Sequence, residues 1–157
     1  AYNHNKLSPL TNRAISQFAP GSTMKIPTAI AAQLAGKPGI SLHVLGGHVR
    51  ENTLAAVGPW AWDALESVSV DIAFIGANGI TAERGLTTPD VDEARVKSAF
   101  VEKGRRVIAL ADHTKFGRED FALIAPLFAV DTVITDSAID NEHLLEIEMS
   151  GPDVVVA

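Results

Sequence analysis

The 157-residue chain contains no cysteine, only two methionines and only one tyrosine. Without cysteine it can form neither a disulfide bond nor a thiolate metal site. Its 5 histidines are scattered and do not show a metal-ligand spacing such as HExxH. We therefore expect no structural or catalytic metal and no bound cofactor.

Basic charge and long apolar runs are also scarce. The formal net charge of −6 disfavours attraction to nucleic-acid phosphates, which requires a clustered basic face. No apolar run reaches the length of about 18 residues that crosses a membrane, and no secretory signal is visible. We expect a cytoplasmic protein without a membrane partner, folded as a single domain over residues 1–157, since this length is typical of one domain.

Short apolar runs that end in glycine or polar residues alternate with helical patterns along the chain. This alternation predicts an α/β fold with a mainly parallel sheet flanked by helices. The expected strands are 40–45, 70–75, 107–110, 132–135 and 153–157, and the expected helices are 28–35, 59–68, 89–103 and 141–149. Open α/β sheets bind ligands at the carboxyl ends of their strands, so the chemistry should lie just after each run.

The start of the helix expected at 89–103 is marked by two residues. Thr88 is a good N-cap, and Pro89 suits the first helical position, where an amide hydrogen would be unpaired. Farther along, Glu93 and Lys97 share a narrow arc of this helix with apolar residues. That spacing fits either an ordinary i,i+4 ion pair at the edge of the buried face or a pair that faces a ligand.

Residues 79–88 connect a buried strand to that helix. We expect a loop here, longer than most such connections, which have about six residues, and long loops at strand ends often carry function. Asn78 stands between Gly76 and Gly79. The backbone there can come close to a bound molecule while the Asn amide offers a donor and an acceptor, or it can form a simple turn.

Lys115 follows the strand expected at 107–110. Its ammonium group could meet an anionic ligand while Asp112 holds it in place, or it could be solvated while Asp112 caps the turn. Gly46 and Gly47 could cradle an oxyanion with their amides, with Arg50 nearby, although paired glycines are common in turns. The shared placement of these motifs at strand ends favours a ligand site.

Several longer motifs follow one another in a fixed order. They are Val44-Leu-Gly-Gly-His-Val-Arg50, Val57-Gly-Pro59, Asp71-Ile-Ala-Phe-Ile-Gly-Ala-Asn-Gly-Ile80, Gly85-Leu-Thr-Thr-Pro-Asp90, Glu93-Ala-Arg-Val-Lys97, Ala111-Asp-His-Thr-Lys-Phe-Gly117 and Ile134-Thr-Asp136. In this order and spacing, residues 26–157 resemble the effector-sensing domain of DeoR-type bacterial transcriptional regulators.

The resemblance implies a fold related to ribose-5-phosphate isomerase and sugar-phosphate-binding proteins. It also implies a repressor of sugar-metabolism genes that senses a phosphorylated sugar. Such a regulator forms a homo-oligomer and binds operator DNA through a separate N-terminal helix-turn-helix domain. These properties are expectations that come from the resemblance and not from the composition.

The resemblance also implies a ligand site, and no catalytic residue. Its members are Gly46, Gly47, Arg50, Asn78, Gly79, Thr87, Thr88, Glu93, Lys97, Asp112 and Lys115. Asn78 and Gly79 would shape the sugar site, and Lys115 would meet a phosphate or a sugar hydroxyl. Glu93 and Lys97 would orient polar groups of the ligand from the helix. Arg50 could equally pair with an acid across an interface.

The chain departs from the family pattern near its start. Residues 1–20 offer one short helical stretch and no helix-turn-helix pair, so we expect the DNA-binding domain to be absent from them. The family has a strand, a phosphate loop, a helix and another strand before the segment similar to 26–34. Here Phe18–Thr23 runs almost directly into that segment. We expect such a stretch to be missing around residues 20–27, and we do not assign Gly21-Ser22-Thr23 as the phosphate loop.

An enzyme on the same fold is the alternative function. A sugar-phosphate isomerase or deaminase needs a base, which Glu93 could supply, while Lys115 or Lys97 stabilises an enediolate. Asn78, however, stands at the strand end where a second acid is needed, and an amide cannot exchange protons. A sensor is therefore favoured, and a purely structural oligomerisation module is a third possibility.

Overall fold

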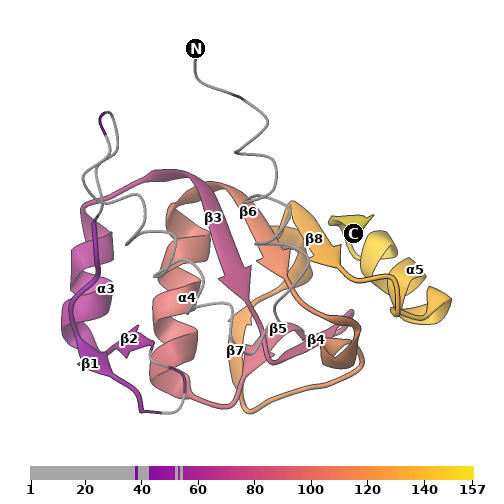
Figure 1. The fold of residues 1–157 in the computed structure, drawn as a ribbon, viewed down its shortest axis with the longest axis horizontal. Coiled ribbons are helices and arrows are strands. Elements are labelled where there is room, and N and C mark those ends of the chain that lie inside the picture. Colours follow the sequence, from indigo (N-terminus) through magenta and orange to yellow (C-terminus); the bar gives the residue numbers. More distant parts are fainter. Residues whose placement is uncertain (1–37, 39–42, 52, 54) are drawn as a thin grey trace.

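The computed structural model describes residues 38, 43–51, 53 and 55–157 (Figure 1). The helix expected at 28–35, the first half of the strand expected at 40–45 and the stretch expected to be missing around 20–27 lie outside this part. The described elements are β1 (His48–Val49), β2 (Ala56–Val57), α3 (Pro59–Glu66), β3 (Val70–Gly76), β4 (Gly79–Thr81), β5 (Gly85–Thr88), α4 (Val91–Lys103), β6 (Gly104–Leu110), the 3-10 turn η3 (His113–Lys115), β7 (Ala122–Ala125), the 3-10 turn η4 (Leu127–Ala129), β8 (Thr132–Thr135), α5 (Asn141–Met149) and β9 (Asp153–Val156).

A four-stranded parallel sheet forms the centre of the fold, with the strand order β3-β6-β8-β9. Gly76 at the end of β3 pairs with Leu110 of β6, and Leu110 pairs with Ile134 of β8. The carboxyl ends of these three strands therefore lie at one edge, as their arrowheads show in Figure 1. The prediction of an α/β fold with a mainly parallel sheet is confirmed.

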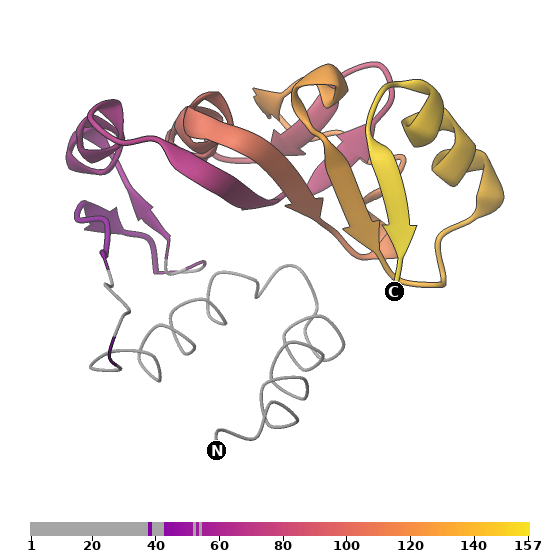
Figure 2. The ribbon, with the colours of Figure 1, turned by 90° about the horizontal axis from the view of Figure 1, so that it is seen from above.

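Helices α4 and α5 pack on one face of this sheet, and α3 packs on α4 (Figure 2). Both β3-α4-β6 and β8-α5-β9 connect neighbouring parallel strands in the same direction along the sheet, and right-handed crossovers of this kind place their helices on the same face. On the other face, Ile72 and Phe74 of β3 are 49% and 60% exposed. None of the described helices is long and apolar enough to cross a membrane.

Residues 79–88 form a β-hairpin and not the long loop that the sequence predicts. Strands β4 and β5 pair antiparallel, and β7 adds to β5 to give a second sheet with the order β4-β5-β7. Thr87 and Thr88 are polar and therefore typical of a loop, yet both are completely buried. The hairpin forms because the backbone of β5 pairs with β7. The N–H of Asp120, which precedes β7 and lies 33 residues after Thr87, also donates to the Thr87 hydroxyl.

Helix α4 begins at Val91, so the predicted N-cap at Thr88 is wrong. The cap is Asp90, whose carboxylate accepts a hydrogen bond of 2.8 Å from the main-chain N–H of Glu93. Thr88 stays extended because it pairs with Ala122 as the last residue of β5. Pro89 accordingly precedes the helix.

The first predicted strand is also corrected. The described residues of 40–45, namely 43–45, are not part of a strand, and the nearest strand is β1 at His48–Val49. It pairs antiparallel with β2 in a small hairpin. Helix α3, in contrast, starts at Pro59 as predicted and ends at Glu66.

Candidate functional site

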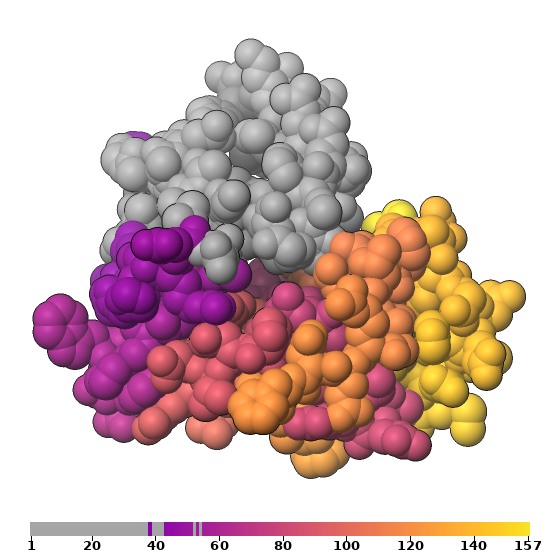
Figure 3. Space-filling view, turned by 90° about the horizontal axis from the view of Figure 1, so that it is seen from below, coloured from indigo at the N-terminus to yellow at the C-terminus, as the bar shows by residue number. Residues whose placement is uncertain are grey.

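Polar residues follow three of the parallel strands at their carboxyl ends. Asn78 follows β3, Asp112 follows β6 and Asp136 follows β8. Because the register aligns these strand ends, the three residues succeed one another along the edge in the order of the strands. Figure 3 shows the molecule from this side, where the indigo hairpin and the magenta and orange segments meet.

A cluster of charges lies beside this edge, at the start of α4. Glu93 contacts Arg50 through one carboxylate oxygen at 2.6 Å and Lys97 through the other at 2.7 Å. Arg50 also lies 3.3 Å from the carboxylate of Asp90. The structure thus brings together three of the predicted site residues, and it shows that Arg50 has acidic partners within its own chain.

Burial distinguishes this cluster from an ordinary surface ion pair. The Glu93 side chain is only 8% exposed, so a carboxylate without partners would be strongly disfavoured there. Arg50 reaches it from the β1–β2 hairpin, where its own N–H donates to the carbonyl of Ala55 at 3.0 Å. The cluster therefore ties the hairpin to the first turns of α4.

The side chain of Asn78 is held by Thr88. The Thr88 hydroxyl donates a hydrogen bond of 3.0 Å to the amide oxygen of Asn78, and the Asn78 main-chain N–H donates to the carbonyl of Thr87 at 2.9 Å. With its oxygen engaged, and with no partner for its two N–H donors among the described residues, the Asn78 amide can donate to another molecule. Thr88 is thus a residue that orients Asn78.

Gly79 and Thr87 have structural partners. The Thr87 hydroxyl donates to the carbonyl of Gly79 at 3.1 Å and accepts from the N–H of Asp120 at 3.0 Å. A Cβ atom on Gly79 would lie 2.7 Å from the Thr87 hydroxyl and would also clash with the carbonyl of Arg118. Only glycine fits here, because the segment 117–120 passes directly over the strand end.

Asp112 caps a turn and does not hold Lys115. Its carboxylate accepts a hydrogen bond of 2.9 Å from the N–H of Thr114 and a second from the Thr114 hydroxyl. The sequence left open whether Asp112 pairs with Lys115 or caps the turn, and the geometry favours the cap. Within the part of the chain that the structure describes, the ammonium group of Lys115 has no ion pair or hydrogen bond, although the residue is half-buried.

The turn that carries Lys115 lies next to the Asn78 strand end. Phe116 forms a bridge with Ile80, and the N–H of Gly117 donates to the carbonyl of Ile80 at 3.0 Å. The residue after Lys115 is therefore fixed beside β4. Lys115 and Asn78, which are far apart in the sequence, belong to the same corner of the sheet.

His113 and Asp136 form a contact that sequence reasoning missed. The His113 Nδ1 atom lies 2.8 Å from a carboxylate oxygen of Asp136, whose other oxygen accepts from the His113 N–H at 2.8 Å. Both residues stand in motifs at strand ends, Ala111-Asp-His-Thr-Lys and Ile134-Thr-Asp. Their shared position after neighbouring parallel strands is the signal that could have found the pair.

Gly46 and Gly47 differ in their surroundings. Gly47 has a φ of 134°, and a Cβ atom on it would lie 2.6 Å from the carbonyl of Val57 and 3.3 Å from the side chain of Ala61. Glycine at this position therefore allows β2 and α3 to approach. A Cβ on Gly46 would meet nothing within 4 Å, so the close approach explains only one of the two glycines.

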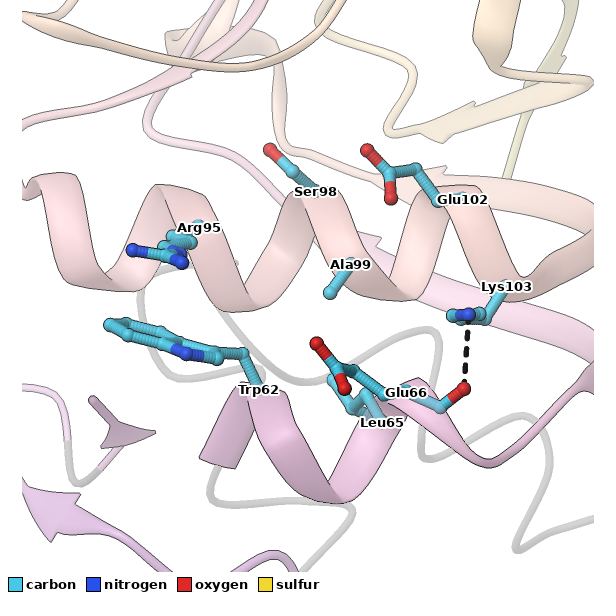
Figure 4. A pocket seen from close by; sticks show the side chains of 8 residues that line it. All are labelled: Trp62, Leu65, Glu66, Arg95, Ser98, Ala99, Glu102 and Lys103. Carbon is cyan, nitrogen blue, oxygen red and sulfur yellow. Dashed lines mark hydrogen bonds between the residues drawn. The ribbon is translucent and has the colours of Figure 1, made fainter. Parts of the chain in front are cut away.

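A surface hollow of about 510 Å³ lies away from these residues, between α3 and α4 (Figure 4). The guanidinium group of Arg95 covers the Trp62 ring at 3.8 Å from its centroid, and Lys103 donates to the carbonyl of Glu66 at 3.2 Å. None of the predicted site residues lines this hollow. Its charged groups are of both signs, so its chemistry favours no single class of ligand.

Comparison with known proteins now decides the family. Residues 22–137 match the family model described as the DeoR C-terminal sensor domain. The chain belongs to the DeoR family. The resemblance seen in the sequence is thereby confirmed, and the DeoR family and its named members are transcriptional regulators and not enzymes.

Three relatives illustrate how far the similarity of this DeoR-family chain extends. It is 44% identical over 110 residues, or 70% of its length, to the HTH-type transcriptional regulator GlpR of Haloferax volcanii, of which the match covers 43%. It is 32% identical over 127 residues to the HTH-type transcriptional repressor GlcR of Bacillus subtilis (81% of this chain, 49% of the relative). It is 30% identical over 127 residues to a putative aga operon transcriptional repressor of Escherichia coli O157:H7 (81% and 47%). The chain spans about half the length of the curated relatives it matches.

Proposed function

We propose that residues 1–157 form a single sensor domain that binds a phosphorylated sugar at the carboxyl edge of the parallel sheet. The observation that carries the proposal is the half-buried ammonium group of Lys115, which has no partner within the described residues and lies in the same corner as the free amide donors of Asn78. A cation and neutral donors in this arrangement suit a ligand that carries an anionic group and hydroxyl groups.

The charge balance of the cluster on α4 supports our proposal that Lys115 meets the phosphate. Arg50 and Lys97 carry two positive charges, and Glu93 and Asp90, which contact them, carry two negative charges. The cluster therefore presents no net charge to an incoming anion. We assign it the role of positioning the hairpin and α4 around the ligand, so that Lys115 provides the main attraction to phosphate.

The other predicted residues support this site in the proposal. Thr88 orients Asn78, and Gly79 with Thr87 keeps the strand end close to the segment 117–120. Asp112 shapes the turn that carries Lys115. Gly46 and Gly47 would border the ligand next to Arg50.

The signal would be passed to a separate domain. We propose that the complete protein is a repressor of sugar-metabolism genes that acts as a homo-oligomer and binds operator DNA through a helix-turn-helix domain outside these residues. This assignment is supported by two relatives, which are named as an HTH-type transcriptional regulator and an HTH-type transcriptional repressor. The fold relationship to ribose-5-phosphate isomerase belongs to the same proposal, with the four-stranded parallel sheet as its structural support.

The geometry of Glu93 argues against the enzyme alternative. A general base must have a free carboxylate oxygen within reach of the proton that it removes. Both oxygens of Glu93 are engaged by cations, which block access to them. The regulatory function of the family also argues against an enzyme.

A thermal-shift screen with hexose and pentose phosphates tests the proposal. A ligand that binds only the native fold stabilises it by about 2.7 kcal/mol at a concentration of 100 times its Kd. Lys115→Ala should weaken binding roughly 10- to 100-fold, because a hydrogen bond to a charged group contributes about 1.5–3 kcal/mol. The unphosphorylated sugars should have little effect.

Lys103→Ala is the matched control. Lys103 lies at the end of α4, near the opposite edge of the sheet, and donates to the carbonyl of Glu66. If a sugar phosphate raises the melting temperatures of Lys115→Ala and of the wild type equally, Lys115 is not part of the site. If no sugar phosphate stabilises the wild type, the proposed function is rejected.

A further inference from the structure

Asp136 is positioned by the backbone of two loops. One carboxylate oxygen accepts the N–H of His113 at 2.8 Å, and the other accepts the N–H of Ala138 at 2.9 Å. The first donor follows β6 and the second follows β8, so the carboxylate joins two neighbouring strand ends. Its orientation is therefore determined by main-chain geometry and not by a flexible side-chain contact.

These contacts keep the carboxylate ionised. Burial by itself raises the pKa of Asp136, but the N–H groups of His113 and Ala138 and the His113 ring outweigh it, so the pKa lies below the usual value of 3.8. An ionised Asp136 can only accept hydrogen bonds. The His113 Nδ1 atom, at 2.8 Å from it, must therefore carry the proton of this contact.

This arrangement determines what the other side of the imidazole can do. Nδ1 is engaged, and the remaining ring nitrogen, Nε2, has no hydrogen bond within the described residues. The His113 side chain is 44% exposed. Its ring therefore offers Nε2 to solvent or to a ligand, in an orientation that Asp136 controls.

The charged surroundings of the ring come from several elements. Asp136 approaches from the end of β8, while Asp112 and Lys115 flank His113 in the same turn. From α5, His143 lies against Gly117, with contacts to Asp140 and Glu146 of its own helix. Within the described part of the chain, Asp136 is the only one of these groups that forms a hydrogen bond or ion pair with the His113 ring.

We propose that His113 is a ligand-binding residue of the sensor site, and that Asp136 positions its ring so that Nε2 donates a hydrogen bond to an anionic oxygen of the effector. This inference rests on the proposed function, because it adds a second cationic contact to the phosphate at Lys115. It goes beyond the predicted site, in which neither residue was included.

The proposal predicts that ligand binding depends on pH. A neutral imidazole with its proton on Nδ1 can only accept at Nε2, so donation to an oxyanion requires the doubly protonated ring. Histidine side chains gain this proton between about pH 8 and pH 5. Binding of an anion should therefore take up a proton and become stronger as the pH falls through this range.

Sulfate is the probe that isolates this effect, because its charge stays the same in this range, whereas a phosphate monoester gains a proton near pH 6. Sulfate affinity for the complete 157-residue chain is measured by thermal shift and by isothermal titration at several pH values, with chloride at equal ionic strength as the reference. We expect roughly tenfold stronger binding at about pH 5.5 than at about pH 8. His113→Gln should remove most of this dependence.

Two further variants separate a binding role from a structural one. Asp136→Asn keeps the shape of the side chain but removes the carboxylate that orients the His113 ring, so sulfate binding should weaken. His143→Gln is the matched control, since this histidine contacts acids of its own helix and should leave the pH dependence unchanged. A parallel loss in all three variants would overturn the proposal.

A measurement on the wild type does not depend on the folding of any variant. The imidazole resonances of His113, followed by NMR, should shift on addition of sulfate, and those of His143 should not. The proposal is wrong if His113 does not respond, or if His113→Gln binds sulfate and sugar phosphates with the wild-type pH dependence. The proposed function fails separately, if no sugar phosphate stabilises the wild type at any pH.

Discussion

Arg50 and Glu93 are 43 residues apart in the sequence, and their side chains are joined by a hydrogen bond of 2.6 Å. The contact links the β1–β2 hairpin to α4, and Lys97 completes it from the next turn of the helix at 2.7 Å. A buried carboxylate therefore ties the hairpin to the helix.

Glu93→Ala should destabilise the protein by about 2–3 kcal/mol, because it leaves the partly buried Lys97 without its partner and Arg50 with Asp90 alone. Urea unfolding followed by circular dichroism measures the loss. Glu102→Ala, on the exposed side of the same helix, is the control and should change the stability by less than about 0.5 kcal/mol. Similar losses in both variants would show that the cluster adds nothing to ordinary helix energetics.

Gly79→Ala should cost about 1–3 kcal/mol, because the added methyl group meets the hydroxyl of Thr87 at 2.7 Å and a backbone carbonyl that cannot move away easily. Gly46→Ala is the matched glycine variant, since nothing lies within 4 Å of its Cβ position. Thermal unfolding of the two variants compares them directly. An unchanged melting temperature for Gly79→Ala would mean that the segment 117–120 can shift freely.

Thr88→Val should weaken binding of a stabilising sugar phosphate roughly fivefold, since the loss of a hydrogen bond of about 1 kcal/mol leaves the Asn78 amide without a fixed orientation. Isothermal titration measures the affinity. Thr132→Val removes another buried hydroxyl, at the amino end of β8, and should leave the affinity unchanged. Equal affinities for the wild type and Thr88→Val would contradict the role given to this contact.

Asp136→Asn should lower the stability near neutral pH by roughly 1 kcal/mol, a value reduced for the partial exposure of the carboxylate. The folded pKa of Asp136 lies below the usual 3.8, so its contribution is present above that pH and is lost as the pH falls through the folded value. Denaturation curves should therefore differ near pH 7 and converge in acid. Asp71→Asn, a change at an exposed surface pair, should leave the curve unaltered over the whole range.

Much of the central sheet could be predicted from the sequence alone. Continuous apolar runs such as 70–75 and 107–110 are typical of buried parallel strands, and the helical patterns between them indicate right-handed crossovers. This local information also locates the polar residues at the carboxyl edge. Asn78, Asp112 and Lys115 were therefore found before any contact was known.

Prediction from local sequence patterns failed where pairing with a distant strand decides the conformation. Residues 79–88 lie between a strand and a helix and were therefore expected to form a loop, but pairing with β7 makes them a hairpin, and the cap of α4 is Asp90 instead of Thr88. Likewise, the i,i+4 spacing of Glu93 and Lys97 predicted a pair but not its burial. The third partner, Arg50, comes from a hairpin that the pattern did not predict.

The sequence by itself determined the four parallel strands β3, β6, β8 and β9, the edge at which polar residues gather and the family motifs. These features depend on residues that are neighbours along the chain. Only the tertiary structure decided which of the polar residues are partners: Arg50 with Glu93, Thr88 with Asn78 and His113 with Asp136. Each of these contacts requires strands or helices from different parts of the chain to lie side by side, and the register that brings them together is set by the packing of the whole core.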